Sequence, residues 1–220
     1  MASINLTGLK TIIFKSEQEA QNYAKKRVIE ALKAEPPFER SVLVQQNKVI
    51  AEVDGYAYSV PMDLPSYRKY KNLSLIHGHP DSFEKGKTSP ISTGDINCLL
   101  LNNNINSVRA YSSVGEHSTI TRKSGFLDKI KTFFTAPVRF RIDEYKLDKK
   151  IIPDELRQRE KIFKANMKKG NIDWDNPELI YDEQLKAAKT KDAALKTHQF
   201  LTTTMPKYGL DYTTNYSYLV

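Results

Sequence analysis

Two histidines and a carboxylate stand close together near the middle of the sequence, in a pattern that can bind a metal ion. His77 and His79 follow the apolar run 73–76 and are separated by one glycine. Side chains two residues apart on a strand point to the same side, so both imidazoles can reach one ion. Asp95 follows Ser92, where the sequence predicts the first turn of a helix. His77, His79 and Asp95 are therefore the candidate metal ligands.

The types of these ligands indicate the metal and the kind of site. Two neutral imidazoles and one carboxylate can form a tetrahedral Zn²⁺ site, and three protein ligands leave the fourth position to water. A catalytic zinc ion has this open arrangement, whereas a structural zinc ion has four protein ligands. The chain contains one cysteine, Cys98, so a cysteine-rich zinc site is excluded. The expected cofactor is Zn²⁺.

A water molecule activated by zinc still needs a general base, and two glutamates are candidates. Glu39 follows the helix-ending pair Pro36-Pro37 and stands at the entry to a predicted strand, where its carboxylate could accept the water proton. Glu52 lies on the next predicted strand and remains the alternative. Ser92 begins the same helical turn as Asp95, so its hydroxyl is a candidate donor to the oxyanion of a tetrahedral intermediate. Ser92 and Asp95 also fit a helix capping box, which requires no metal.

The surrounding pattern predicts strands and helices in the order of an α/β sandwich over about the first 125 residues. Apolar residues recur at three- and four-residue steps behind Ser16, which predicts a helix with Ser16 at its start. Pro and Gly-rich turns separate short apolar runs that predict strands. Helices are expected at 16–34 and 92–101, and strands at 10–14, 41–45, 49–53, 56–60, 73–76, 107–112 and 118–122.

The motif His-x-His-Pro at residues 77–80, followed by Ser-x-x-Asp at residues 92–95, resembles the signature of the JAMM metallopeptidases, also called MPN+ or JAB. The segment that begins at Glu39 is similar to the upstream glutamate segment of that family. The resemblance covers residues 10–122 and implies an MPN-like, cytidine-deaminase-like mixed sheet flanked by helices. It implies a zinc peptidase or isopeptidase in which Glu39 is the base, the signature residues bind the metal and Ser92 is the oxyanion donor.

Two features depart from the family pattern. The loop from Pro80 to Ile91 has 12 residues, more than is usual in the family, and would flank the site where it can contact a substrate. Val42 stands where a glycine commonly follows the family glutamate. Family members cleave ubiquitin or ubiquitin-like proteins from lysine, process sulfur-carrier tails, or occur in bacterial toxin systems and phage proteins. The resemblance therefore implies a protein or peptide substrate, with a ubiquitin-like protein and a bacterial or phage effector role among the alternatives.

Residues 126–220 are expected to form a basic, mostly helical extension, which places a domain boundary near residue 125. Residues 121–170 contain 15 basic and 7 acidic side chains, a net charge of +8 that equals the formal net charge of the whole chain. Such a segment can attract nucleic acid or an acidic surface, or it can be a solvated helix face. A second hypothesis follows: a catalytically silent module, similar to the RadC proteins, that binds nucleic acid through residues 121–170.

Composition limits the class of protein. The chain has 220 residues, of which 40% are hydrophobic, and its mean hydropathy is −0.54. A membrane-spanning helix needs about 20 consecutive apolar residues, and no run of that length occurs in the sequence. The N-terminus has no apolar segment followed by a cleavage site, so a cytoplasmic location is expected, with delivery as an effector as the alternative.

Overall fold

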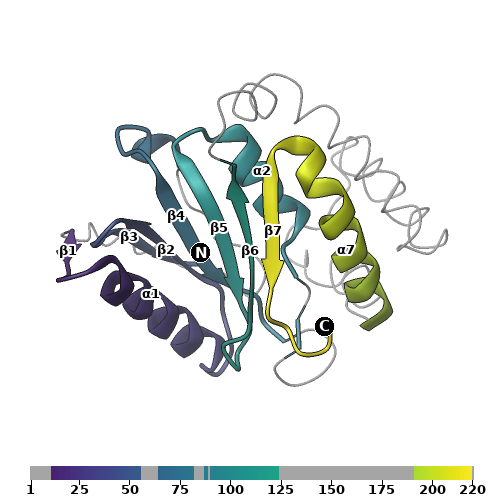
Figure 1. Ribbon diagram of the computed structural model, residues 1–220. Coiled ribbons are helices and arrows are strands. Elements are labelled where there is room, and N and C mark those ends of the chain that lie inside the picture. The colour runs from purple at the N-terminus through teal and green to yellow at the C-terminus, as the bar shows by residue number, and fades with distance from the viewer. Residues whose placement is uncertain (1–10, 56–63, 82–86, 89, 124–190, 220) are drawn as a thin grey trace, which may run out of the picture.

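The computed structural model describes residues 11–55, 64–81, 87–88, 90–123 and 191–219 (Figure 1). These residues form a mixed sheet of seven strands with helices packed against it, so the expected α/β class is confirmed. The strands are β1 (Ile12–Ile13), β2 (Arg40–Gln45), β3 (Lys48–Asp54), β4 (Leu73–Gly78), β5 (Ile105–Tyr111), β6 (His117–Arg122) and β7 (Leu210–Thr214). The helices are α1 (Glu17–Leu32), α2 (Thr93–Leu101) and α7 (Lys191–Thr204), with short 3₁₀ turns η1 (Leu64–Tyr67) and η2 (Met205–Tyr208).

The strand order is β1-β3-β2-β4-β5-β6-β7. Only β4 and β5 run parallel among these neighbours, and α2 connects them; every other neighbouring pair is antiparallel. A parallel pair needs such a crossover connection, which explains why a helix lies between these two strands in the sequence. The crossover connects the carboxyl end of β4, next to His77 and His79, with the start of α2, which contains Asp95.

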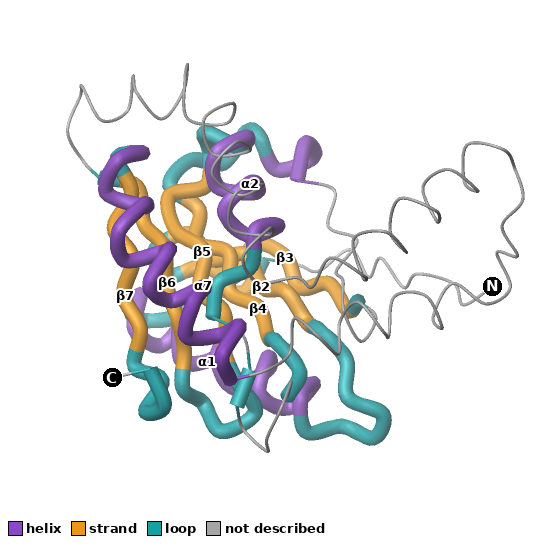
Figure 2. The backbone as a smooth tube through the Cα atoms, turned by 90° about the vertical axis from the view of Figure 1, so that its right-hand side faces the viewer, coloured by secondary structure: helices purple, strands orange, loops and turns teal. Residues whose placement is uncertain are grey.

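Alternating side chains along the strands build two separate cores, one on each face of the sheet. On one face, α1 packs with Val42, Val44 and Ile76. On the other, α2 and α7 pack with residues of the opposite parity, including Leu43 and Leu75. Figures 1 and 2 show α1 against one face and α2 and α7 against the other. Strands β2 and β4 are therefore buried on both faces, and the parity of a residue decides which helices it meets.

The first helix begins where the capping pattern predicts. The amide nitrogen of Glu19 donates to Ser16 Oγ at 3.2 Å, so Ser16 is the N-cap. The Glu19 carboxylate accepts from the amide of Lys15 at 3.1 Å instead of from that of Ser16. The helix ends at Leu32, two residues earlier than predicted.

The end of the chain belongs to the same sheet as its beginning. Strand β7 pairs with β6, and α7 contributes Leu201 to the core beneath α2. Within the extension that the sequence predicts to be mostly helical, residues 210–214 form a strand. The expected strand at 56–60 lies outside the described residues, as do residues 126–190 of the expected extension. The boundary near residue 125 stays a prediction.

Within the part of the chain that the structure describes, no helix has both the length and the apolar character needed to cross a membrane.

Candidate metal centre

Strand β4 delivers both histidines to one side of the sheet. His77 has the parity of Leu73 and Leu75, so it faces the layer of α2. The chain stays extended beyond Gly78, because the amide of His79 donates to the carbonyl oxygen of Tyr111 at 2.9 Å. The two imidazoles therefore emerge together at the carboxyl end of β4, as their spacing predicts.

Helix α2 delivers the carboxylate through its first turn. Ser92 is the N-cap, and its Oγ accepts from the amide of Asp95 at 3.2 Å. Asp95 Oδ2 in return accepts from the amide of Ser92 at 2.8 Å and from its hydroxyl at 2.7 Å. The predicted capping box is confirmed, and it fixes the Asp95 side chain in one orientation. Oδ2 is held by the cap, while Oδ1 points at His77.

The three candidate ligands converge on one point. His77 Nε2 lies 2.9 Å from Asp95 Oδ1, and His79 Nε2 lies 3.3 Å from Asp95 Oδ2. The two Nε2 atoms are 3.1 Å apart. One donor atom of each residue lies within 4.8 Å of the others, so the group could hold a metal ion. The three side chains are between 6 and 12% exposed, which shields the cluster from bulk water.

Burial and the neighbouring imidazoles determine the charge of this cluster. Burial alone raises the pKa of Asp95, but His77 and His79 outweigh it and hold the pKa of that carboxyl well below its usual range. Asp95 is therefore an anion in the folded chain. His77 Nδ1 is buried and has no hydrogen-bond partner among the described residues, so the contacts of Nε2 alone orient this ring.

The pairing of strands β2 and β4 places Glu39 beside the histidine cluster. Ser41 pairs with His77 across β2 and β4. The same register carried two residues further places Glu39 opposite His79 and on the same face. The electrostatics agree with this position. The pKa of Glu39 is raised, mainly by burial; the charges of His79 and His77 lower it, and that of Asp95 raises it. The carboxylate of Glu39 therefore interacts with all three candidate ligands.

Glu52, the alternative base, faces the other side of the sheet. It pairs with Val42, which belongs to the core beneath α1. Its carboxylate accepts from Arg27 Nη2 at 2.6 Å and lies 3.3 Å from Arg40 Nε. Tyr23 also donates to it at 3.3 Å. Glu52 thus belongs to a structural ion-pair network that the sheet separates from the histidines.

Two further hydrogen bonds hold the loop between His79 and Ser92. Ser113 Oγ donates to the Asp81 carboxylate at 2.8 Å and so ties down the chain just after His79. At the other end of the loop, the Tyr218 hydroxyl donates to the carbonyl oxygen of Thr88. Sequence reasoning did not connect the tail with the site; the tyrosine-rich composition of residues 208–220 was the available signal, but no local spacing reveals which segment the tail contacts.

The other two histidines and the single cysteine take structural positions. His117 packs its ring against Tyr111, and His198 Nδ1 lies 3.1 Å from the Tyr212 hydroxyl. Cys98 is partly buried against the core beneath α2, and burial raises the pKa of its thiol to about 12. Of the basic segment 121–170, only residues 121–123 are described, so its expected role stays a prediction.

Comparison with protein-family models, with curated proteins and with solved structures found no match to this chain. The resemblance to the JAMM signature therefore stays a resemblance, and what it implies about function is a proposal.

Proposed function

We propose that this chain is a zinc-dependent hydrolase of the JAMM type that cleaves a peptide or isopeptide bond. The observation that carries the proposal is the convergence of His77 Nε2, His79 Nε2 and an Asp95 oxygen, with Glu39 in register beside them. The three candidate ligands alone would also suit a structural metal ion. The additional half-buried carboxylate of Glu39, within electrostatic reach of the cluster, is what favours hydrolysis.

The donor set fits zinc. Zinc bonds to imidazole nitrogen and carboxylate oxygen are about 2.0–2.2 Å long, so tetrahedral ligand atoms lie about 3.3 Å apart. His77 Nε2 lies 2.9 Å from Asp95 Oδ1 and 3.1 Å from His79 Nε2, and His79 Nε2 lies 3.3 Å from the other Asp95 oxygen, Oδ2. Two imidazole nitrogens 3.1 Å apart also need a proton or a cation between them, because facing lone pairs repel each other. These distances support the proposal.

Each residue would have a defined task. His77 and His79 bind through Nε2 as neutral imidazoles, and Asp95 binds through Oδ1, while the capping box holds its Oδ2 in place. Zinc at this position would supply Lewis acidity, which polarises the scissile carbonyl and acidifies a water molecule. Ser92 Oγ donates to Asp95, so its proposed second task as oxyanion donor requires this hydrogen bond to be shared or broken.

Glu39 would move the proton. Its carboxylate takes a proton from the attacking water, whose oxygen forms a bond with the carbonyl carbon of the substrate. Glu39 then passes the proton to the leaving nitrogen as the carbon–nitrogen bond breaks, which yields a carboxylic acid and an amine. Burial raises the pKa of Glu39, and a carboxylate with a raised pKa is a stronger base for this transfer.

The test compares cleavage by the wild-type chain and by Glu39→Gln, with zinc added, on a panel of peptides and ubiquitin-like conjugates. General-base catalysis contributes about 10²–10⁴-fold, so Glu39→Gln is expected to lose at least a hundredfold in rate while it keeps its zinc. Glu52→Gln serves as the matched control and should cleave normally at a temperature where it is folded. Equal activity of Glu39→Gln and the wild type would reject the proposed mechanism.

A further inference from the structure

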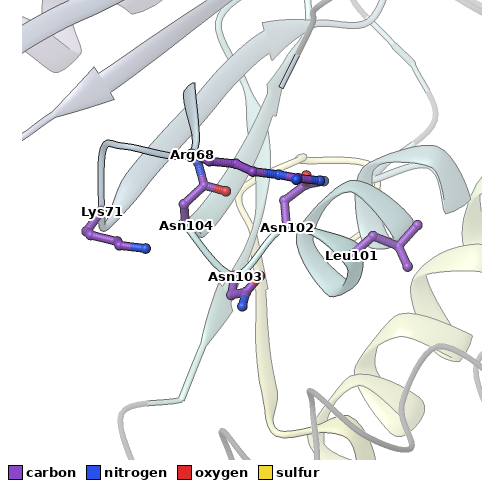
Figure 3. Close-up of a pocket in the computed structure, with 6 residues that line it drawn as sticks. All are labelled: Arg68, Lys71, Leu101, Asn102, Asn103 and Asn104. Atoms are coloured by element: carbon purple, nitrogen blue, oxygen red, sulfur yellow. The ribbon is translucent and has the colours of Figure 1, made fainter. Parts of the chain in front are cut away.

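A polar hollow lies at the end of the sheet opposite the metal centre. It has a volume of about 280 Å³ and is lined by Arg68, Lys71, Leu101, Asn102, Asn103 and Asn104 (Figure 3). Strand β4 begins beside it at Leu73 and reaches His77 four residues later, so the two sites are separated by about 13 Å along the strand. The hollow therefore shares no residue with the proposed hydrolase site and can be tested independently of it.

The hollow carries a concentrated positive charge. Its wall contains two cations, Arg68 and Lys71, and no carboxylate. The two stretches that form it, residues 68–71 and 101–104, contain no Asp or Glu. Within the described part of the chain, neither Arg68 nor Lys71 has an acidic partner at ion-pairing distance. Arg68 and Lys71 are both exposed, so their side chains are accessible to a ligand.

Arg122, and neither Arg68 nor Lys71, binds the free carbonyl groups at the end of α2. A cation near the end of a helix commonly satisfies its last carbonyl groups. At the end of α2, Arg122 does this: its Nη2 donates to the carbonyl oxygens of Leu99 and Asn102, and its Nε donates to that of Ile105 at 2.9 Å. Arg68 and Lys71 are therefore not needed to cap this helix.

The walls of the hollow are fixed in place. The amide of Leu73 donates to the carbonyl oxygen of Asn104 at 2.9 Å, and the Asn104 side chain donates to the carbonyl oxygen of Tyr67 at 3.1 Å. The Asn102 side chain donates to the carbonyl oxygen of Cys98 at 2.8 Å. The turn that carries the two cations is thus bonded to the turn that carries the asparagines. A site held in this way loses little conformational entropy when a ligand binds.

We propose that this hollow binds a phosphate monoester. Two cations match the charge of about −1.5 to −2 that a phosphate monoester carries near pH 7, whereas a carboxylate carries only one negative charge. The Arg68 guanidinium can donate two parallel hydrogen bonds to phosphate oxygens, Lys71 adds a point charge, and the exposed Asn103 amide adds a neutral donor. The hollow, at about 280 Å³, lies just below the range of about 300–1,000 Å³ typical of small-molecule sites, which suits a phosphate group with a small organic substituent.

The experiment is titration calorimetry on the full chain at low salt and near neutral pH, after removal of divalent metal so that no anion binds through a metal ion at the histidine cluster. The probes are phenyl phosphate, benzoate and inorganic phosphate. The double variant Arg68→Gln/Lys71→Gln tests the site. Lys69→Gln is the matched control, because Lys69 lies between them in the sequence, does not line the hollow and instead sits 5.2 Å from the ring centre of Tyr70. Circular dichroism checks that each variant is folded.

Phenyl phosphate is expected to bind the wild-type chain saturably, and more tightly than benzoate. Loss of two charge-assisted contacts should weaken its binding about tenfold or more in the double variant, and Lys69→Gln should change it by less than about threefold. Equally tight binding of inorganic phosphate would support the site with free phosphate as the ligand; weaker binding would support an organic monoester. The proposal is overturned if phenyl phosphate does not saturate, if benzoate binds equally well, or if Lys69→Gln loses as much affinity as the double variant.

Discussion

Glu39 and Glu52 lie on opposite faces of one sheet, and replacing each by glutamine should separate stability from chemistry. Glu52 is 9% exposed and pairs with Arg27, which is 34% exposed, and with Arg40, which is 10% exposed. Exposed pairs contribute about 0–1 kcal/mol, and breaking a fully buried pair costs about 3–5 kcal/mol. This partly buried pair lies between the two cases, so Glu52→Gln should lower the free energy of unfolding by about 2 kcal/mol.

The assay is denaturant and thermal unfolding of the metal-free chain, followed by circular dichroism. A chain of this size loses about 2–4 °C in Tm per kcal/mol, so Glu52→Gln should unfold about 4–8 °C lower. Glu39→Gln should unfold at the wild-type temperature or above it, because folding buries a carboxylate whose charged form burial disfavours.

Glu30→Gln is the control for the ion pair. Glu30 also pairs with Arg27, at 2.9 Å, but its side chain is 44% exposed, so the loss should stay below about 0.5 kcal/mol. If Glu39→Gln proves more destabilising than Glu52→Gln, Glu39 is a structural residue and the reasoning from the strand register is refuted.

Three more predictions follow from single residues. Burial, Arg109 and Lys25 lower the pKa of His117 from 6.5 to about 4. Between these pH values the unfolded chain binds a proton at His117 that the folded chain does not, so the free energy of unfolding should fall as pH drops from about 6.5 to about 4 and level off below. His117→Gln should remove this part of the pH dependence. An unchanged pH profile in His117→Gln would contradict the prediction. Cys98 has a pKa of about 12, so a thiol reagent near pH 8 should label the folded chain far more slowly than the unfolded one; immediate labelling of folded protein would show that the thiol is accessible. A Cβ atom at Gly78 would lie 2.8 Å from Leu32 Cγ, so Gly78→Ala should cost about 1–3 kcal/mol in unfolding experiments, and less in a Leu32→Ala background; the same cost in both backgrounds would exclude this clash.

Local patterns were sufficient to predict most of the described elements and the cluster of His77, His79 and Asp95. Ser16 and Ser92 each marked the start of a helix, and both are N-caps. The spacing of His77 and His79 required only that β4 be extended as far as Gly78, which it is. A strand alternates its side chains whatever its neighbours are, so this part of the site could be read from residues close together in the sequence.

The choice between Glu39 and Glu52 could not be read in this way. Both lie at or on predicted strands, and the face that each occupies depends on how β2 pairs with its two neighbours. That pairing includes an irregularity between Leu43 and Val44, which the sequence does not announce. A shift of one residue reverses every side chain on a strand, so only the register of the folded sheet distinguishes the two carboxylates.

Contacts between distant segments could not be predicted from the sequence either. The pairing of β7 with β6 and the bond from Tyr218 to Thr88 join residues about a hundred or more positions apart. Their strength comes from packing and hydrogen bonds that form only in the folded chain, and nothing in the local composition of the tail specifies its partner. The hollow beside Arg68 was missed for the same reason, because its two walls come from separate turns.

The central claim, that His77, His79 and Asp95 bind one metal ion, is tested most directly by measuring zinc. The chain is loaded with zinc, desalted and analysed for metal by mass spectrometry. The account predicts about one zinc ion per wild-type chain and almost none for His79→Ala or Asp95→Asn. The chain has four histidines, and the other two provide matched controls: His117→Ala and His198→Ala should keep their zinc. A folded wild-type chain that binds no zinc, or folded His79→Ala and Asp95→Asn variants that retain it, would contradict the account.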